Sequence, residues 1–443
     1  MSTPVPPSSA CIHVEGGEGL EKRSLTLGFI PLTDCALLVM AKEKGFFARH
    51  GLDVTLSREV SWANVRDKVA TGALDAAQML AGMPIASTLG IDAFKVPMLT
   101  AFSMDLNGNA ITVSRELYAR MEAADPQATQ TAPVSARALK AVIDSDRAQG
   151  RPPLTFAHVF PYSPHNYELR YWLAAGGVHP DRDVRLIVVP PPQMVDQLQA
   201  GNIDGYCVGE PWNERAVCAD TGRVVVTNYE IWNNVPEKVL GVTHEWAQRH
   251  PNTHRALLRA LLETAAWVDR AENRDETVRA IAREEYVDAP VDVVSMSMSG
   301  GLVYARGEEA RQLADFNVFH RYAANFPWRS HAEWFITQMY RWGQIEAPVD
   351  IRQAADTVYR PDIYRLAAAD LGLPVPLEDR KEEGGHTGAW ELATATAPIP
   401  MGPDRFLDGR RFSPTDPLGY LAGFDVHSRR VDMAALATMN AAA

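Results

Sequence analysis

The fold of this chain is decided by the stretch LTLGFIPLTDCALLVMAKEKGFFARHGLDV, residues 25–54. It begins with a short run of β-forming side chains, continues with the apolar run CALLVMAKEKG, and ends as GLDVTL starts a second strand. Thr33 and Asp34 stand where a side chain can cap the intervening helix. The stretch is therefore predicted to be a βαβ unit with parallel strands.

The same alternation of strands and helices continues along the chain. A helix over about 63–70, the strand LDAAQML, a helix begun by Pro84 and the strand VPMLTAF follow in turn. After a helical stretch over 114–153, a second series runs through the strand LTFAHVF, a helix begun by Ser163, the strand VRLIVV, a helix through Leu198 and the strand DGYCVG. Such alternation predicts an α/β protein with mostly parallel sheets covered by helices.

Two short segments link these series. KVATGALDAAQM and QLQAGNIDGYCV share a helix end, a glycine, an apolar residue and an aspartate that enters a strand. Glycine suits a left-handed helix stop, and aspartate suits a turn. The similarity favours two lobes of similar construction over one large sheet.

The rest of the chain has a different pattern. From Glu237 to Val287 it is largely helical, an aromatic-rich stretch over 316–343 is expected in the core, and beyond Leu373 proline, glycine and charge dominate. Lys238 is placed in a linker-like stretch where the chain returns to the first lobe. The predicted divisions are a flexible leader 1–23, lobe one 24–112, lobe two 113–235, a return to lobe one 236–373, and a surface-wrapping tail 374–443.

Composition excludes several functional classes. The chain has 55 acidic against 43 basic residues and no long basic run, which argues against a direct nucleic-acid partner. No run is long and apolar enough for a membrane span, and no export signal is readable, so we expect a cytoplasmic protein. The four cysteines form no CxxC pair; free buried thiols are favoured, with a Cys207–Cys218 disulfide as the alternative.

Signatures of catalysis are missing from the sequence. It contains no GxxxxGK[ST], HExxH or GxSxG motif, and no GxGxxG follows a strand. His250 and His254 have i,i+4 spacing, but Pro251 separates them and no further ligand completes a metal set. We therefore expect a protein without enzymatic activity, cofactor or metal.

Hydrogen-bond donors at strand ends and helix starts remain as candidates for a binding site. In open α/β sheets, ligands bind outside the carboxyl ends of the strands. Ser163, Pro164 and the Gly176-Gly177 stop delimit a helix whose first turn carries a histidine. Free N–H groups at such a helix start attract anions. The candidate donors are Trp62, Asn109, His165, Gly209 and Lys238.

Each candidate also has an ordinary structural explanation. Trp62 could pack in the core, Asn109 could satisfy a turn, and His165 could be a polar residue on a helix end. Gly209 could serve only a tight turn before the helix begun by Pro211, and Lys238 could be a solvated surface charge. The residues alone leave both explanations open.

Six ordered segments resemble the solute-binding proteins of nitrate, nitrite and bicarbonate ABC transporters. The resemblance spans residues 25–373, and the later segment FLDGRRFSPTDPLGYLAGFDV is similar to that family's carboxyl end. It implies a two-lobed, type II periplasmic-binding-protein fold with one anion between the lobes. The segments are LTLGFIPLTDCALLVMAKEKGFFARHGLDV, SWANVRDKVATGALDAAQML, DLNGNAITV, SPHNYELRYWLAAGGV, GYCVGEPWNE and PEKVLGVTHEWAQRHP.

The resemblance also implies a ligand set. In nitrate-binding members a tryptophan, a glutamine, a histidine, a glycine amide and a lysine hold the anion, and they fall here on Trp62, Asn109, His165, Gly209 and Lys238. The departure is Asn109, where the family pattern LNGQAI reads LNGNAI, so the amide reaches less far. Nitrate and nitrite only accept hydrogen bonds, which suits a pocket of donors. A lysine in place of the carboxylate and calcium expected for bicarbonate favours nitrate or nitrite.

Without an export signal, the resemblance is strongest to the cytoplasmic NasS-type sensors of that family. These imply a nitrate or nitrite sensor that holds an ANTAR-domain RNA-binding antiterminator and releases it when the anion binds. A periplasmic solute-binding protein whose signal is lost is the alternative. An enzyme on the same fold, as in thiamine-precursor synthesis, would need a cysteine-rich metal motif that the sequence does not contain.

Overall fold

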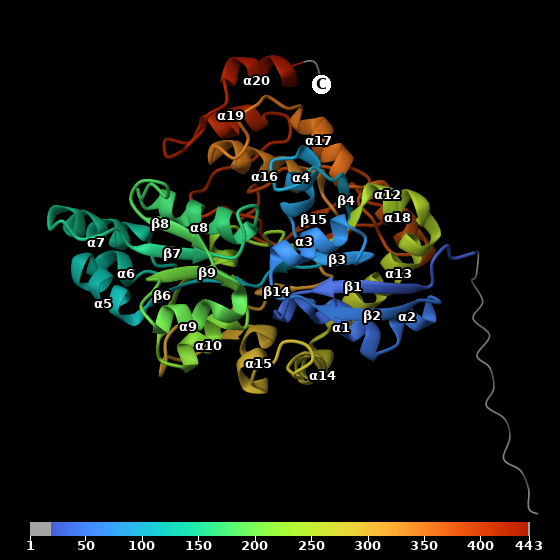
Figure 1. Ribbon diagram of the computed structural model, residues 1–443, viewed down its shortest axis with the longest axis horizontal. Coiled ribbons are helices and arrows are strands. Elements are labelled where there is room, and N and C mark those ends of the chain that lie inside the picture. Colours follow the sequence, from blue (N-terminus) through green and yellow to red (C-terminus); the bar gives the residue numbers. More distant parts are fainter. Residues whose placement is uncertain (1–18, 442–443) are drawn as a thin grey trace, which may run out of the picture.

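The computed structural model describes residues 19–441 and consists of two α/β lobes side by side (Figure 1). Each lobe is built on a five-stranded sheet, and the two sheets have the same topology. Three neighbouring strands are parallel, the fourth runs antiparallel to them, and the fifth pairs antiparallel with the fourth. The two-lobed periplasmic-binding-protein architecture predicted from the sequence is confirmed.

The first lobe contains the βαβ unit with which the described chain begins. The inner parallel strands are largely buried because α1, α2 and α13 (Pro251–Val268) cover one face of the sheet and α3 and α4 cover the other, whereas the edge strand is partly exposed (Figure 1). In spatial order the strands are β2 (Asp53–Arg58), β1 (Ser24–Phe29), β3 (Ala76–Leu80), β11 (Lys238–Thr243) and β4 (Met98–Ser103); the first helices are η1 (Thr33–Cys35), α1 (Ala36–Glu43), α2 (Phe46–Arg49), α3 (Trp62–Ala70) and α4 (Met83–Leu89).

The second lobe repeats this plan. Its sheet, in the matching spatial order, has the strands β8 (Arg185–Val188), β7 (Thr155–His158), β9 (Gly205–Gly209), β6 (Asn109–Ser114) and β10 (Gly222–Thr227). Its helices are α5 (Arg115–Ala124), α6 (Pro126–Thr129), α7 (Ala136–Ala148), α8 (Pro164–Ala175), η2 (Pro191–Gln193), α9 (Met194–Gln199), α10 (Trp212–Cys218) and α11 (Asn228–Ile231).

The predicted internal similarity corresponds to the same helix-to-strand connection in both lobes. Gly72 and Gly201 end their helices with φ of +76° and +70°, the left-handed conformation that glycine adopts without strain. Asp75 accepts a hydrogen bond from the N–H of Thr26 (2.9 Å), and Asp204 accepts one from the N–H of Thr155 (2.7 Å). In each lobe the aspartate thus ties the entry of one strand to its neighbour.

The chain crosses between the lobes twice, and a backbone hydrogen bond joins the two crossing segments. Strand β5 (Leu106–Asn107) pairs with β14 (Asn317–Val318), and the N–H of Asn107 donates to the Val235 carbonyl (2.9 Å). Strand β6 already belongs to the second sheet, so the chain crosses before residue 109 and the predicted division between 112 and 113 cuts this strand. Strand pairing outweighs the local pattern here.

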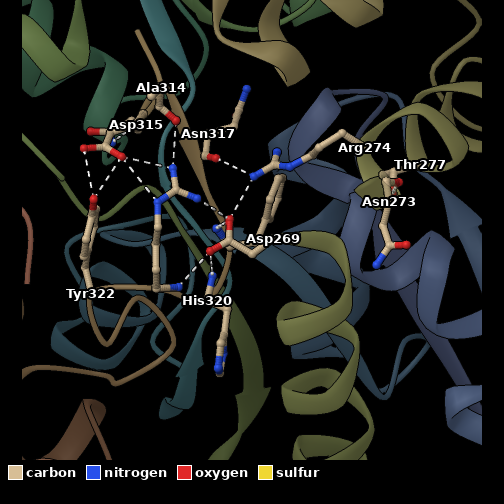
Figure 2. Close-up of polar contacts among 12 residues, drawn as sticks. Asp269, Asn273, Arg274, Thr277, Ala314, Asp315, Asn317, His320 and Tyr322 are labelled. Carbon is tan, nitrogen blue, oxygen red and sulfur yellow. Dashed lines mark hydrogen bonds and ion pairs between the residues drawn. The ribbon is translucent and has the colours of Figure 1, made fainter. Parts of the chain in front are cut away.

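A buried ion-pair network anchors the loop that carries β14 (Figure 2). Asp269 receives the guanidinium groups of Arg321 (2.6 Å) and Arg274 (2.8 Å). Burial opposes ionisation of Asp269, but the two arginines hold its pKa below the usual value. Arg321 also contacts Asp315 (3.1 Å), whose carbonyl accepts from the Asn107 amide (2.7 Å). The network therefore fixes the loop directly against the crossing segment.

The return segment begins with a strand, which corrects the sequence prediction. Lys238 lies in no linker: it is the first residue of β11, the strand between β3 and β4. Helices follow, as predicted. They are α12 (His244–Arg249), α13 (Pro251–Val268), η3 (Ala271–Asn273), α14 (Arg274–Ile281), α15 (Val291–Ser299), α16 (Arg329–Arg341), α17 (Ile351–Val358) and α18 (Pro361–Asp370), with the short hairpin β12 (Gly301–Leu302) and β13 (Arg311–Gln312).

The carboxyl-terminal part is more than a surface wrap. Phe406 is buried and stacks on Trp232 with ring centroids 4.6 Å apart, and Tyr420 and Phe424 pack beside it. The segment runs over both lobes (Figure 1) and contributes to their shared core. The sequence did not predict this role, because the buried rings of this segment are irregularly spaced and produce no periodic signal. Its elements are β15 (Trp390–Leu392), β16 (Ile399–Met401), α19 (Pro417–Ala422) and α20 (Met433–Asn440).

Other sequence predictions meet mixed outcomes. The predicted leader lies mostly outside the described residues, but Glu21 accepts hydrogen bonds from the Thr253 backbone and hydroxyl. Of the described cysteines, Cys35 and Cys207 are free and buried as expected, whereas Cys218 is free and exposed. Most rings of 316–343 are buried, as predicted. Among the described helices, none has the length and apolar character that crossing a membrane requires.

Candidate functional site

The candidate site lies where the carboxyl edges of the two sheets face each other. An antiparallel strand places its first residue at the edge where its parallel neighbours end. Lys238, first in β11, therefore pairs with Leu80, the last residue of β3, and Asn109, first in β6, pairs with Gly209, the last residue of β9. Both crossing segments thus enter their sheets at the cleft. This arrangement brings residues from distant parts of the chain together.

Lys238 is the only cationic side chain among the five predicted residues at neutral pH, and it is completely buried. Its ammonium contacts Asp34 (2.7 Å) and Glu237 (2.6 Å), and its backbone N–H donates to Asp105 (2.9 Å). Burial by itself would lower the pKa of Lys238, but the surrounding carboxylates raise it well above its usual value. The interpretation of Lys238 as a solvated surface charge is therefore wrong.

Asp34 does not cap the first helix as predicted. The N-cap of α1 is Cys35, and neither Thr33 nor Asp34 accepts a capping hydrogen bond there. The Asp34 carboxylate instead accepts from the Gln78 amide and from Lys238. An ammonium in a low-dielectric site attracts a carboxylate more strongly than a helix N–H group does, so the tertiary contact prevails.

Trp62 begins α3 directly after its N-cap, Ser61, whose hydroxyl accepts from the Asn64 N–H (3.2 Å). The indole is 1 % exposed, and the Lys238 ammonium lies 5.6 Å from the ring centroid. The indole Nε1 is buried and has no hydrogen-bond partner among residues 19–441. Trp62 therefore both packs in the core and offers an unused donor beside the lysine.

His165 lies in the first turn of α8, as the sequence predicted. Ser163 caps this helix by accepting from the Asn166 N–H (3.0 Å), and Pro164 occupies the first turn. The imidazole is fully buried, with Nδ1 3.3 Å from Glu237, and neither ring nitrogen satisfies hydrogen-bond geometry within the described chain. Burial, with a contribution from Lys238, holds its pKa well below the usual value. The ring is neutral and donates from one nitrogen.

Asn109 and Gly209 form the wall contributed by the second lobe. The Asn109 side-chain amide donates to Glu168 (3.1 Å), while its oxygen is buried without a partner in the described part of the chain. A Cβ on Gly209 would lie 3.3 Å from that oxygen and 3.4 Å from Leu32 of the first lobe. The donor of Asn109 is thus already engaged, and Gly209 keeps the space between the lobes narrow.

The lobes are in direct contact around these residues. The Thr33 N–H donates to the Glu210 carbonyl (2.8 Å), and the Trp212 indole donates to the Pro31 carbonyl (3.2 Å). The Tyr162 hydroxyl donates to the Ile91 carbonyl on another side of the cleft. Trp62, Asn109, His165, Gly209 and Lys238 are all brought together and enclosed, whereas a surface cavity of about 700 Å³ near Trp246 contains none of them.

Sequence analysis missed the acidic residues of the site. Asp34, Asp105, Glu168 and Glu237 are buried around Lys238, and burial raises the pKa of Asp105 and Glu237 well above the usual range. Two signals were available. Asp34 and Asp105 follow the ends of β1 and β4, and Glu168 stands one helical turn after His165. The expectation of a pocket made mainly of donors is therefore incomplete.

The arrangement suits binding of a small polar ligand. It offers unused donors on Trp62 and His165, a compensated ammonium on Lys238, and unused acceptors on Asn109 and Glu237. The buried thiol of Cys207 contacts Glu168 (3.7 Å), and burial raises its pKa well above the usual value, which keeps the thiolate scarce. These residues can hold a ligand, and they contain no activated nucleophile.

Comparisons with known proteins agree with the fold. The NMT1-like family matches residues 18–282. The nitrate import ATP-binding protein NrtC of Synechocystis is 42% identical over 414 residues, 93% of this chain and 57% of the relative. The bicarbonate transport ATP-binding protein CmpC of the same strain is 40% identical, with 92% and 56% coverage. The chain thus spans little more than half the length of these ATP-binding relatives.

Binding proteins of the same family match over almost their whole length. The nitrate/nitrite binding protein NrtA of Synechococcus elongatus is 34% identical over 434 residues, 95% of this chain and 89% of the relative. The crystal structure of the periplasmic nitrate-binding protein NrtA from Synechocystis PCC 6803 superposes with a TM-score of 0.81 at 30% identity, and covers 92% of this chain and 100% of that one. The chain therefore belongs to the NMT1-like family, among the solute-binding proteins that resemble NrtA.

Proposed function

We propose that this protein is a binding protein for nitrate or nitrite, which it holds between its lobes. One observation carries the proposal: two buried donors without a partner in residues 19–441, the Trp62 indole and the His165 imidazole, converge beside the Lys238 ammonium. Planar oxyanions with several acceptor oxygens satisfy such donors. The printed names of the NrtA relatives support the same ligand class.

A lysine in the site also supports nitrate or nitrite over bicarbonate. Its ammonium occupies the place where the family resemblance expects the carboxylate and calcium ion of bicarbonate-binding members, and a positive charge there repels a calcium ion. Relatives named for bicarbonate transport are nevertheless similar to this chain, so bicarbonate belongs in every binding experiment. No catalytic step is part of the proposal.

Calorimetry tests the ligand. We expect nitrate or nitrite to bind without metal, and bicarbonate to bind weakly with or without calcium. Trp62→Phe removes one donor but keeps the ring, so affinity should fall about 10- to 100-fold, as for a lost hydrogen bond to a charged group. Trp390→Phe is the matched control, because its indole is also buried without a described partner but lies in β15. Calcium-dependent binding of bicarbonate alone would overturn the proposal.

The role of the bound anion has two candidates. Similarity to NrtA supports a solute-binding protein of an ABC transporter, the alternative kept in the sequence analysis. The cytoplasmic sensor that holds an ANTAR-domain antiterminator rests on the sequence resemblance alone. In the sensor role, closing the lobes on nitrate changes the surface offered to the partner, and a coupling of about 1–3 kcal/mol alters partner affinity roughly 5- to 150-fold.

Fractionation and partner capture separate these roles. A sensor remains in the cytoplasmic fraction and binds an ANTAR-domain regulator in anion-free buffer, with capture falling as nitrate is added. A transport protein is recovered from the periplasmic fraction and captures no such regulator. The fractionation uses the protein expressed from its native start, because the native start determines whether the protein is exported.

A further inference from the structure

We propose that the site binds its anion together with a proton, and that Glu168 on α8 is the residue that receives the proton. The inference rests on the proposed anion-binding function and deepens it by naming the residue that sets the pH dependence. Glu168 is 2 % exposed and lies beside Asn109, in the wall contributed by the second lobe.

The first argument is charge. The Lys238 ammonium is already paired with Asp34 (2.7 Å) and Glu237 (2.6 Å), and Asp105 and Glu168 are buried nearby. His165 is neutral and contributes no positive charge. Because burial raises the pKa values of Asp105 and Glu237 well above the usual range, these two groups are mainly protonated, and an ionised Glu168 is a negative charge in excess of the Asp34–Lys238 ion pair. In a low-dielectric site a further negative charge is repelled unless a proton arrives with it.

The second argument is hydrogen bonding at Glu168. One carboxylate oxygen accepts from the Asn109 amide (3.1 Å), and the other accepts from the Asn228 amide (3.3 Å). Both amides thus spend a donor on the ionised carboxylate. The Asn109 oxygen, in contrast, is buried with no partner in the described residues. The site thus holds Asn109 with its acceptor unused and its N–H2 group turned towards Glu168, where one of its two N–H bonds is engaged.

A proton on Glu168 reverses this arrangement. The proton comes from solvent and forms an O–H bond on the carboxylate oxygen that faced the amide. That O–H donates to the Asn109 oxygen after the amide turns over, a rotation that exchanges two groups of similar size. The Asn109 N–H2 group then points away from Glu168 and is free to donate to the anion. One proton therefore removes a negative charge and supplies the amide donor.

Several other groups surround Glu168 and bear on its titration. Lys238 and Glu237 face it from the start of β11, and the Cys207 thiol contacts it from β9. His165 lies one turn earlier on α8 and is neutral. Burial raises the pKa of Glu168 to about 7, with the two asparagines and Lys238 opposing the rise. Bound nitrate adds negative charge and raises the pKa of Glu168 further, so binding takes up a proton.

The sign of the pH dependence follows from this uptake. Well below pH 7 the proton is already present, and affinity is constant. Above pH 7 the proton must be taken from solvent, and affinity falls by up to about tenfold per pH unit until the pKa of the bound state is reached. Nitrate itself does not titrate in this range, so any dependence comes from the protein.

Calorimetry on the full chain with potassium nitrate tests the inference between pH 6 and 9, in pairs of buffers with different ionisation enthalpies. We expect uptake that rises with pH towards one proton per nitrate. Glu168→Gln is neutral at every pH, and its amide can donate to Asn109. The variant should bind nitrate with little pH dependence and more tightly than the unaltered protein at pH 9. Glu333→Gln, which removes a buried carboxylate of α16 paired with Arg380, should keep the uptake.

The outcomes separate this inference from the proposed function. Nitrate that binds with the same affinity from pH 6 to 9 and without proton uptake overturns the inference and leaves the function standing. Absence of nitrate and nitrite binding at every pH overturns both. Uptake that persists in Glu168→Gln overturns the assignment to Glu168 and moves it to Glu237 or Asp105. Uptake is measured on the unaltered protein, so the test survives a variant that fails to fold.

Discussion

At the scale of single residues, the site is a compromise between binding and burial. Lys238 would be costly to bury alone, and two carboxylates in hydrogen-bond contact make its burial possible. The same contacts compensate the positive charge of Lys238, which the sequence analysis expected to balance the charge of the bound anion. The residue that looked like a lone surface lysine is therefore part of a coupled buried group, and its substitution affects both stability and binding.

Replacing Lys238 by methionine should lower the free energy of unfolding by about 3–5 kcal/mol at pH 7.5, because two buried carboxylates lose their partner. The loss should shrink at pH 5.5. Burial already raises the pKa of Glu237 and the ammonium opposes that rise, so the pKa of Glu237 rises further without Lys238, and protonation at lower pH relieves the repulsion. Urea denaturation at the two pH values measures the effect.

A surface lysine provides the control for this prediction. Lys140 pairs with Asp144 one turn along α7, and Lys140→Met should cost less than about 0.5 kcal/mol. Equal stability of the two variants at both pH values would show that the Lys238 ion pairs do not hold the cleft together.

At the scale of elements, the serine N-caps of α7 and α8 in the second lobe can be compared. Ser163 accepts from the Asn166 N–H (3.0 Å) at the start of α8, and Ser135 accepts from the Arg137 N–H (3.2 Å) at the start of α7. Only α8 carries a residue of the candidate site in its first turn. The caps contribute similarly to helix stability but differently to the site.

Ser163→Ala and Ser135→Ala should each destabilise the fold by about 1 kcal/mol, the usual cost of losing an N-cap. Only Ser163→Ala should weaken nitrate binding, because it loosens the turn that orients His165. Thermal unfolding and calorimetry of both variants check this. Equal binding by the two variants would separate His165 from the ligand.

At the scale of the whole molecule, the carboxyl-terminal segment joins the two lobes. The Phe406 ring stacks on Trp232 and Trp334, with centroids 4.6 Å and 6.1 Å away, and on Tyr171 of α8 at 5.9 Å. The ring therefore lies between α8 of the second lobe and α16 of the return segment. The segment therefore joins the second lobe to the return segment through packed aromatic rings.

Phe406→Ala should lower the free energy of unfolding by about 3–5 kcal/mol, because it removes a fully buried ring among other rings. Leu377→Ala is the control: this side chain of the same segment is 61% exposed, and its loss should change stability by less than about 0.5 kcal/mol. Chemical denaturation distinguishes them. A Phe406 variant as stable as the Leu377 variant would return the segment to a mere surface wrap.

The sequence by itself determined most strands and helices of the two α/β series and their order. Apolar periodicity, the Ser163 cap and the glycine stops at Gly72 and Gly201 act within a few residues, so they were predictable. The resemblance to an anion-binding family also selected five positions, and their role as ligand contacts stays a prediction. Local chemistry and ordered motifs thus predicted the two-lobed fold and a candidate set of donors.

Only the tertiary structure decided which groups face one another. Lys238 reaches the cleft because β11 pairs antiparallel with β3, and Asn109 reaches it because β6 pairs with β9. These pairings join residues that lie far apart in the sequence, which no local pattern encodes. The same pairings bring Asp34 and Glu237 to the ammonium and Glu168 to the Asn109 amide. The balance of donors, acceptors and protons is therefore a property of the assembled cleft.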